Sequence, residues 1–225
     1  MNDTPLLSRP RTGYWKATLA CLAAAAFLSL PALAGTDLKE TTPATPPPSE
    51  KDWTIELGSG AGWSNVRSGQ PNQAYTLVPI TLSSSLALDD VSLDNYLGGW
   101  FRGYSEFYFR GDYDFIVHGP ENRFEDVLFG PRYNFVQPGW KIIPFVEGGV
   151  GIGFADSNPA QGGLGQDFNF TFQAAAGFKY KIDDDWFVRA AVEYQHVSNA
   201  GLSEPQFANH PIDSLGPKVS FGYSF

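Results

Sequence analysis

The chain contains little charge and almost no cysteine. Charged residues make up 17% of the sequence, below the roughly 25% of an ordinary soluble domain, whereas aromatic residues reach 15%. This balance argues against disorder, which requires few aromatic residues and much charge. A net charge of −9 without a basic cluster argues against a nucleic-acid partner, because an acidic surface repels phosphate. No run of about 18 or more apolar residues follows residue 34, so no helix is expected to span a membrane there.

The first 34 residues have the pattern of a secretory signal peptide. Cationic residues precede an apolar stretch from Ala17 to Ala34, which ends in Ala-Leu-Ala, the small-x-small pattern that signal peptidase cuts. Pro31 and this cleavage pattern favour a cleaved signal over a retained anchor helix. The single cysteine, Cys21, lies inside the apolar stretch, so we predict an exported protein without disulfide bonds.

Residues 35–52 are rich in threonine, proline and charge, and they include three consecutive prolines from Pro46 to Pro48. Proline-rich segments favour an extended, solvated backbone. We therefore predict a flexible periplasmic leader without a catalytic role, followed by a single folded domain over residues 53–225.

From Trp53 onward the sequence alternates apolar and polar residues, with many aromatics and glycines and no helical period. The alternating runs are Trp53–Asn65, Tyr75–Leu88, Gly98–Arg110, Phe124–Phe135, Lys141–Phe154, Asp167–Ile182, Trp186–Ser198 and Ser214–Phe225. Most are longer than the roughly 5–6 residues of strands in soluble sandwiches and reach the about 9–11 residues that a membrane-spanning strand needs. We therefore predict an all-β fold, an eight-stranded antiparallel transmembrane β-barrel.

The connections between these runs differ in length. Residues 66–74, 111–123, 155–166 and 199–213 form long connections, 136–139 and 183–185 form short ones, and 89–97 is intermediate. Long loops at one end and short turns at the other are typical of outer-membrane barrels, whose long loops are extracellular. The chain also ends on an aromatic residue, Phe225, which resembles the signal read by the outer-membrane assembly machinery. These features predict the outer membrane of a Gram-negative cell, with membrane lipid around the barrel.

The interior of an eight-stranded barrel is just wide enough for side chains, so we expect no wide aqueous pore. The polar residues expected to fill it are Arg102, Arg110, Arg132, Glu147, Gln173, Arg189 and Glu193. Pro217 interrupts the last run, and since proline cannot donate a hydrogen bond to a neighbouring strand, we expect it at a bulge or at the entry of the strand.

The run 186–198 carries the chemistry. Its even positions are mostly apolar, as at Val192, whereas its odd positions include the charged Arg189 and Glu193. Side chains alternate between the two faces of a strand, and the apolar face of a membrane barrel contacts lipid. His196 and Ser198 share the even positions, so we predict that both face outward near the extracellular end of the strand.

The same argument applies to the last run, whose odd positions are apolar. Asp213 is also at an odd position, so we predict that it faces outward. Antiparallel pairing across residues 199–213 would bring Asp213 beside His196. A serine, a histidine and a carboxylate on one patch can act as nucleophile, general base and orienting acid. Polar groups facing hydrocarbon are costly, so this placement suits an enzyme that acts on a lipid of the outer leaflet. The alternative is that these residues are only interfacial polar groups at a strand end.

The segment His196-x-Ser198-Asn199-Ala200-Gly201-Leu202 closely resembles the HxSNAGL signature of PagL-type lipid A 3-O-deacylases, which are acyloxyacyl hydrolase-like outer-membrane barrels. The similarity extends to residues 132–151 and 165–173. It covers about residues 129–225 and continues more weakly from residue 53.

This resemblance implies an esterase that removes the 3-O-linked acyl chain of lipid A, the membrane anchor of lipopolysaccharide. By this resemblance, Ser198 is the nucleophile and His196 the base. Asn199 and the backbone N–H groups around Ala200 and Gly201 would form the oxyanion hole. No cofactor or metal is implied.

The acidic residue is the least certain part of the resemblance. Residues 209–214 follow the family pattern Asn-x-Gly-apolar-acid-Ser, with Pro211 in place of glycine and Asp213 where some relatives have glutamate. Glu204 in the preceding loop is the alternative acid. Two other functions stay open at this point, a non-enzymatic barrel of the opacity or adhesin type and an outer-membrane phospholipase. The sequence also leaves a homodimer open.

Overall fold

The computed structural model describes residues 53–64, 74–88, 92–93 and 97–225. The predicted signal peptide, 1–34, and leader, 35–52, lie outside the described residues. The strands are β1 Trp53–Gly60, β2 Gly62–Ser64, β3 Tyr75–Leu88, β4 Gly103–His118, β5 Arg123–Phe135, β6 Ile142–Ala155, β7 Phe168–Lys181, β8 Trp186–Ser198 and β9 Ile212–Ser224, and two short 3-10 helices are η1 Gly99–Phe101 and η2 Pro159–Gln161. None of the helices in these ranges is long and apolar enough to cross a membrane.

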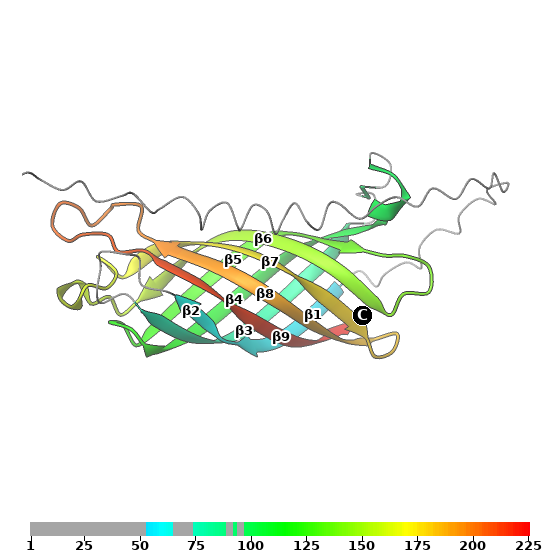
Figure 1. The fold of residues 1–225 in the computed structure, drawn as a ribbon, viewed down its shortest axis with the longest axis horizontal. Coiled ribbons are helices and arrows are strands. Elements are labelled where there is room, and N and C mark those ends of the chain that lie inside the picture. The colour runs from blue at the N-terminus through cyan, green and yellow to red at the C-terminus, as the bar shows by residue number, and fades with distance from the viewer. Residues whose placement is uncertain (1–52, 65–73, 89–91, 94–96) are drawn as a thin grey trace, which may run out of the picture. The chain divides into compact units, whose positions relative to one another are not determined.

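The strands close into one antiparallel barrel (Figure 1). From β3 to β9 each strand pairs with the next one in the chain, and β1 pairs with both β3 and β9. β1 and β2 are two parts of one strand, because both continue in the same register along β9, with Gly60 opposite Lys218 and Trp63 opposite Leu215. The prediction of an eight-stranded antiparallel barrel is therefore confirmed.

Pro217 explains why this strand is divided at Ala61. The Ala61 N–H donates to the Pro217 carbonyl oxygen at 3.0 Å, but Pro217 has no N–H to donate in return. The sequence predicted that Pro217 lies at a bulge or at the entry of its strand, and this prediction was wrong. It lies in the interior of β9, and the interruption appears in the strand opposite.

Two predicted strands, Tyr75–Leu88 and Trp186–Ser198, agree with β3 and β8 in both bounds, but the third run was misplaced. β4 begins at Gly103 and continues to His118, so the connection to β5 is only 119–122 and not the long loop 111–123. Asp112 and Asp114 suggested a loop, yet both are buried on the lumenal face, whereas the outward Phe115 is exposed. Polar residues inside a barrel are thus easily mistaken for loop residues.

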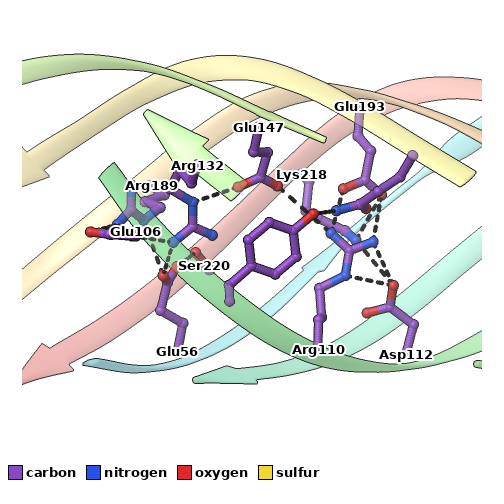
Figure 2. A network of polar contacts seen from close by, with 12 residues as sticks. Glu56, Glu106, Arg110, Asp112, Arg132, Glu147, Arg189, Glu193, Lys218 and Ser220 are labelled. Carbon is purple, nitrogen blue, oxygen red and sulfur yellow. Dashed lines mark hydrogen bonds and ion pairs between the residues drawn. The ribbon is translucent and has the colours of Figure 1, made fainter. Parts of the chain in front are cut away.

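The lumen is filled by ion pairs (Figure 2). Arg132 contacts Glu56, Glu106 and Glu147 at 3.0, 2.8 and 2.5 Å. Arg189 binds Glu56 and Glu106 from the other side, at 3.0 and 3.1 Å. Each charge in this group therefore has an opposite charge beside it, which offsets the cost of removing it from water.

A second group of ion pairs surrounds Arg110. Its guanidinium lies 2.7 Å from Glu193 and 2.6 Å from Asp112, and Lys218 lies 2.8 Å from Glu193 (Figure 2). Six of the seven predicted interior residues lie in the lumen: Arg110, Arg132, Glu147, Gln173, Arg189 and Glu193. The exception is Arg102, which follows η1 and precedes β4.

The outer wall is apolar. Large exposed side chains such as Leu57, Leu82, Phe109, Val127 and Phe178 come from strands all around the barrel. An exposed apolar surface of this extent is the lipid-facing band of a membrane barrel. The chain end Phe225 and the short turns 136–141 and 182–185 lie at one end of the barrel. The connections 119–122, 156–167 and 199–211 lie at the other end (Figure 1).

This two-faced wall predicts different effects of arginine at neighbouring positions of β8. Val192→Arg puts a charge on the lipid face, where it costs about 2–4 kcal/mol at the bilayer midplane, so we expect fewer folded barrels. Gln195→Arg puts the same charge in the lumen, where Gln195 already donates to Asp114, and we expect a smaller loss. The folded fraction can be measured by heat-modifiable gel migration and urea titration. Equal losses for the two variants would contradict this assignment of faces.

Candidate active site

Strand pairing places a histidine beside an aspartate on the outer wall. His196 on β8 lies directly opposite Asp213 on β9, and His196 Nδ1 is 2.7 Å from Asp213 Oδ1. Both side chains are partly accessible, at 37% and 25%. An ionised carboxylate can only accept, so Nδ1 is the donor, and in the neutral imidazole the lone pair is then on Nε2. This is the tautomer that a general base requires.

A tyrosine binds the same carboxylate oxygen. The Tyr194 hydroxyl donates to Asp213 Oδ1 at 2.6 Å, from a position two residues before His196 on the same face of β8. The tyrosine ring also packs against Phe172, with ring centroids 6.4 Å apart. Asp213 is thus held from two sides. The alternation of the strand predicted that Tyr194, at an even position, faces outward, but gave it no role in the site.

Ser198 is the last residue of β8, on the outward face with His196. Its Oγ accepts hydrogen bonds from Asn209 Nδ2 at 2.9 Å and from the Ala200 N–H at 3.2 Å. Among the described residues, no hydrogen bond joins Ser198 to His196. Positions two residues apart on one strand face have Cβ atoms about 6–7 Å apart. Hydrogen bonds between catalytic side chains often tighten only when substrate is present.

The turn after Ser198 explains the residues that follow it. Ala200 and Gly201 both adopt left-handed backbone conformations, with φ of 55° and 81°. The Asn199 side chain stabilises this turn, since its Oδ1 accepts from the Gly201 N–H at 2.9 Å and its Nδ2 donates to Ser203 Oγ at 2.9 Å. Asn199 is fully buried. Asparagine commonly forms such a turn with the backbone two residues on.

The structure therefore engages two of the predicted oxyanion donors elsewhere. The Asn199 amide binds Ser203, and the Gly201 N–H binds Asn199. The donors that lie at Ser198 Oγ are the Ala200 N–H and the Asn209 amide. Asn209 was missed as a site residue. Its place four residues before Asp213, in the segment that matches the family's acidic pattern, was the signal that could have identified it.

The alternative acid lies elsewhere. Glu204 is exposed in the loop between β8 and β9, where its N–H donates to the Gly201 carbonyl oxygen at 3.1 Å. Asp213 is thus the carboxylate that contacts His196. Within the described ranges, no cluster of three or more histidine, cysteine or acidic side chains is arranged to hold a metal ion.

Apolar side chains border the site on both sides. On β7, Phe170 lies opposite Ser198 and Phe172 lies opposite His196, and both rings are exposed on the outer wall. On β9, the exposed Leu215 lies opposite Tyr194. The polar groups therefore open onto a surface that an alkyl chain can cover.

Comparison with known proteins agrees with this geometry. A family model described as lipid A 3-O-deacylase (PagL) matches residues 86–224, which is more than half of the chain. Lipid A deacylase PagL of Pseudomonas aeruginosa is 33% identical over 100 residues, which cover 44% of this chain and 56% of that protein. The chain thus spans about half the length of this curated relative.

Two solved structures share the fold. The crystal structure of the outer membrane enzyme PagL has a TM-score of 0.50 at 24% identity, and the match covers 74% of this chain and 97% of that one. Neisserial surface protein A (NspA) has a TM-score of 0.55 at 10% identity and covers 77% and 97%. The fold is thus that of an outer-membrane β-barrel. With the family match over residues 86–224, the chain belongs to the PagL family of lipid A 3-O-deacylases.

Proposed function

We propose that this protein hydrolyses the ester that links the 3-O-acyl chain to lipid A. The observation that carries the proposal is the outward-facing group in which Asp213 binds His196 and Ser198 lies on the same strand face. Membership of the PagL family supports the substrate class. The position of the group supports it as well, because an ester of an outer-leaflet lipid can reach the barrel wall directly from the membrane.

In the proposed reaction, Ser198 Oγ attacks the ester carbonyl carbon and its proton passes to His196 Nε2. Asp213 stabilises the imidazolium that forms. When the tetrahedral intermediate collapses, the ester bond breaks and His196 returns the proton to the leaving sugar hydroxyl. A water molecule then attacks the acyl-serine, again with His196 as base, and the free fatty acid is released.

We infer an oxyanion hole that keeps the Ala200 N–H implied by the sequence but takes Asn209 in place of Asn199 and Gly201. The Asn209 amide and the Ala200 N–H already point at Ser198 Oγ, and a carbonyl oxygen on a carbon bonded to Oγ would lie close to both. Asn199 and Gly201 would act indirectly, by holding Ala200 in its left-handed conformation. Hydrogen-bond donors that are already in place stabilise the oxyanion more than water does, because they need no reorganisation during the reaction.

The acyl chain would lie along the outer wall of β7. Phe170 and Phe172 lie beside Ser198 and His196 at the same level of the wall, and both rings are exposed. The proposed substrate therefore stays in its leaflet during the reaction. No observation bears on a homodimer, which stays a prediction.

The first test is the nucleophile. Ser198→Ala should leave a folded, heat-modifiable barrel whose deacylase activity is reduced by about 10³-fold or more, because the covalent path is lost. Mass spectrometry of lipid A would show whether one 3-hydroxyacyl chain is removed. Ser84→Ala is the matched control, since Ser84 also lies outward on a strand but far along the wall. A wild-type protein that leaves lipid A intact would favour the adhesin-like barrel, and one that cleaves glycerophospholipids instead would favour the phospholipase.

The second test concerns Asn209. Asn209→Asp keeps an oxygen that can accept from the Asn199 N–H but removes the amide donor to Ser198 Oγ. We expect kcat to fall by about 10²–10³-fold with little change in KM, as for the loss of an oxyanion donor. Asn199→Asp is the comparison. If only the Asn199 variant loses kcat, the oxyanion hole is the one first predicted from the sequence.

The third test concerns Tyr194 as a positioning residue. Tyr194→Phe removes the hydroxyl that binds Asp213 and keeps the ring that packs against Phe172. Loss of a hydrogen bond to a charged group typically costs about 1.5–3 kcal/mol, so we expect kcat to fall by about 10-fold or more. In an Asp213→Asn background the same change should have almost no further effect, because interacting residues are not additive. Full additivity, or an equal loss in Tyr180→Phe on β7, would argue against this role.

A further inference from the structure

The described residues between β3 and β4, 92–93 and 97–102, cover part of the outer wall; they are called the η1 segment below. Tyr133 on β5 occupies an outward-facing position, like the exposed Val127 and Phe129 on the same strand. Yet Tyr133 is only 8% exposed. Its hydroxyl donates to the Phe101 carbonyl oxygen at 2.5 Å and accepts from the Leu93 N–H at 3.0 Å. The η1 segment therefore lies against the lipid-facing side of the barrel.

Further contacts hold this segment against the end of β5. Gln137 Nε2 donates to the Gly99 carbonyl oxygen at 2.9 Å, and the Val136 N–H donates to the Arg102 carbonyl oxygen at 2.8 Å. The rings of Phe101 and Phe135 lie 6.3 Å apart. The position of η1 on the wall is thus fixed by side chains and backbone together.

The other side of the segment is apolar and uncovered. Trp100 is 83% exposed, the highest value among the large hydrophobic side chains of the described residues, and Leu97 is 58% exposed. Trp140 in the neighbouring turn between β5 and β6 is also exposed. Tryptophan favours the boundary between membrane and water, because its ring is apolar while its N–H can hydrogen-bond.

An aromatic girdle already marks this end of the barrel. Trp186 at the start of β8 stacks on Phe221 at 4.9 Å, and Tyr223 stacks on Phe225 at 6.1 Å. This is the end with the chain terminus and the short turns, which is the periplasmic end in outer-membrane barrels. η1 adds Trp100 to the aromatic residues at this end, beside the end of β5. The exposed Lys141 beside Trp140 supplies a cation at the level of lipid phosphates.

We propose that Leu97 and Trp100, together with Trp140, form an interfacial anchor that inserts into the periplasmic leaflet of the membrane. Its partner is a glycerophospholipid surface, with Leu97 and Trp100 at the boundary of acyl chains and headgroups. A lipid surface fits better than a soluble protein, because the segment packs on the lipid-facing Tyr133 and continues the aromatic girdle. The anchor fixes the depth and tilt of the barrel in the membrane. It acts at the end opposite His196 and Ser198, so it is independent of the proposed reaction.

Site-specific fluorescence tests this proposal. The full chain with Cys21→Ser and one new cysteine, Trp100→Cys, is purified from outer membranes, labelled with an environment-sensitive fluorophore and reconstituted in vesicles of phosphatidylethanolamine and phosphatidylglycerol. Asp184→Cys in the exposed turn after β7 serves as the aqueous reference, and Phe178→Cys on the outer wall serves as the lipid reference. Leu97→Cys gives a second probe of the anchor. Heat-modifiable migration shows that each variant is folded.

We expect the probes at positions 97 and 100 to be quenched by nitroxides placed near the lipid headgroup. Iodide in the water should quench them several-fold less than the probe at position 184. Equal iodide quenching at positions 100 and 184 would overturn the proposal. Protection from both iodide and lipid nitroxide would also overturn it, since a protein surface such as a second copy would then cover the segment.

Discussion

The structure depends on one constraint, that a chain crossing hydrocarbon must satisfy its backbone hydrogen bonds within itself. Closing the sheet through β1, β3 and β9 leaves no free edge. A closed sheet has two unlike faces, so each strand must alternate between lipid and lumen. The division between β1 and β2 has a local cause, because Ala61 lies opposite the only residue of β9 that has no N–H to offer.

The lumen shows how the barrel accommodates its charges. Arg132 and Arg189 share Glu56 and Glu106, and Arg110 shares Glu193 with Lys218. Removing one partner would leave a buried charge without compensation, which is far more costly than the pair itself is favourable. This network occupies the lumen, whereas the candidate catalytic residues lie on the outer wall and in the loop after β8.

On the outer wall the polar groups compensate one another. Asp213 accepts hydrogen bonds from Tyr194 and His196, and Ser198 accepts them from Asn209 and the Ala200 N–H. The donors and acceptors that face lipid are therefore largely paired. The site lies at strand ends, where the loop 199–211 supplies further hydrogen-bond donors through its left-handed turn and Asn209. A site of this kind can meet a lipid without extracting it from the membrane. The proposed interfacial anchor at the opposite end would hold the barrel at a constant depth.

The sequence by itself determined the barrel, its strand number and which residues face lipid, because an alternation of period two leaves only two choices for each residue. It also placed Ser198, His196 and Asp213 on the outer wall, since parity points all three outward, and the distinctive Ser-Asn-Ala-Gly segment predicted their catalytic roles. It misplaced β4, because Asp112 and Asp114 resemble loop residues unless the lumen that buries them is known. The hairpin also predicted Asp213 beside His196, and the register of β8 and β9 confirms it. Only the tertiary structure decided the turn that engages Asn199 and the approach of Asn209 to Ser198. Both features depend on the path of the loop 199–211, and alternation along a strand carries no information about how a loop folds.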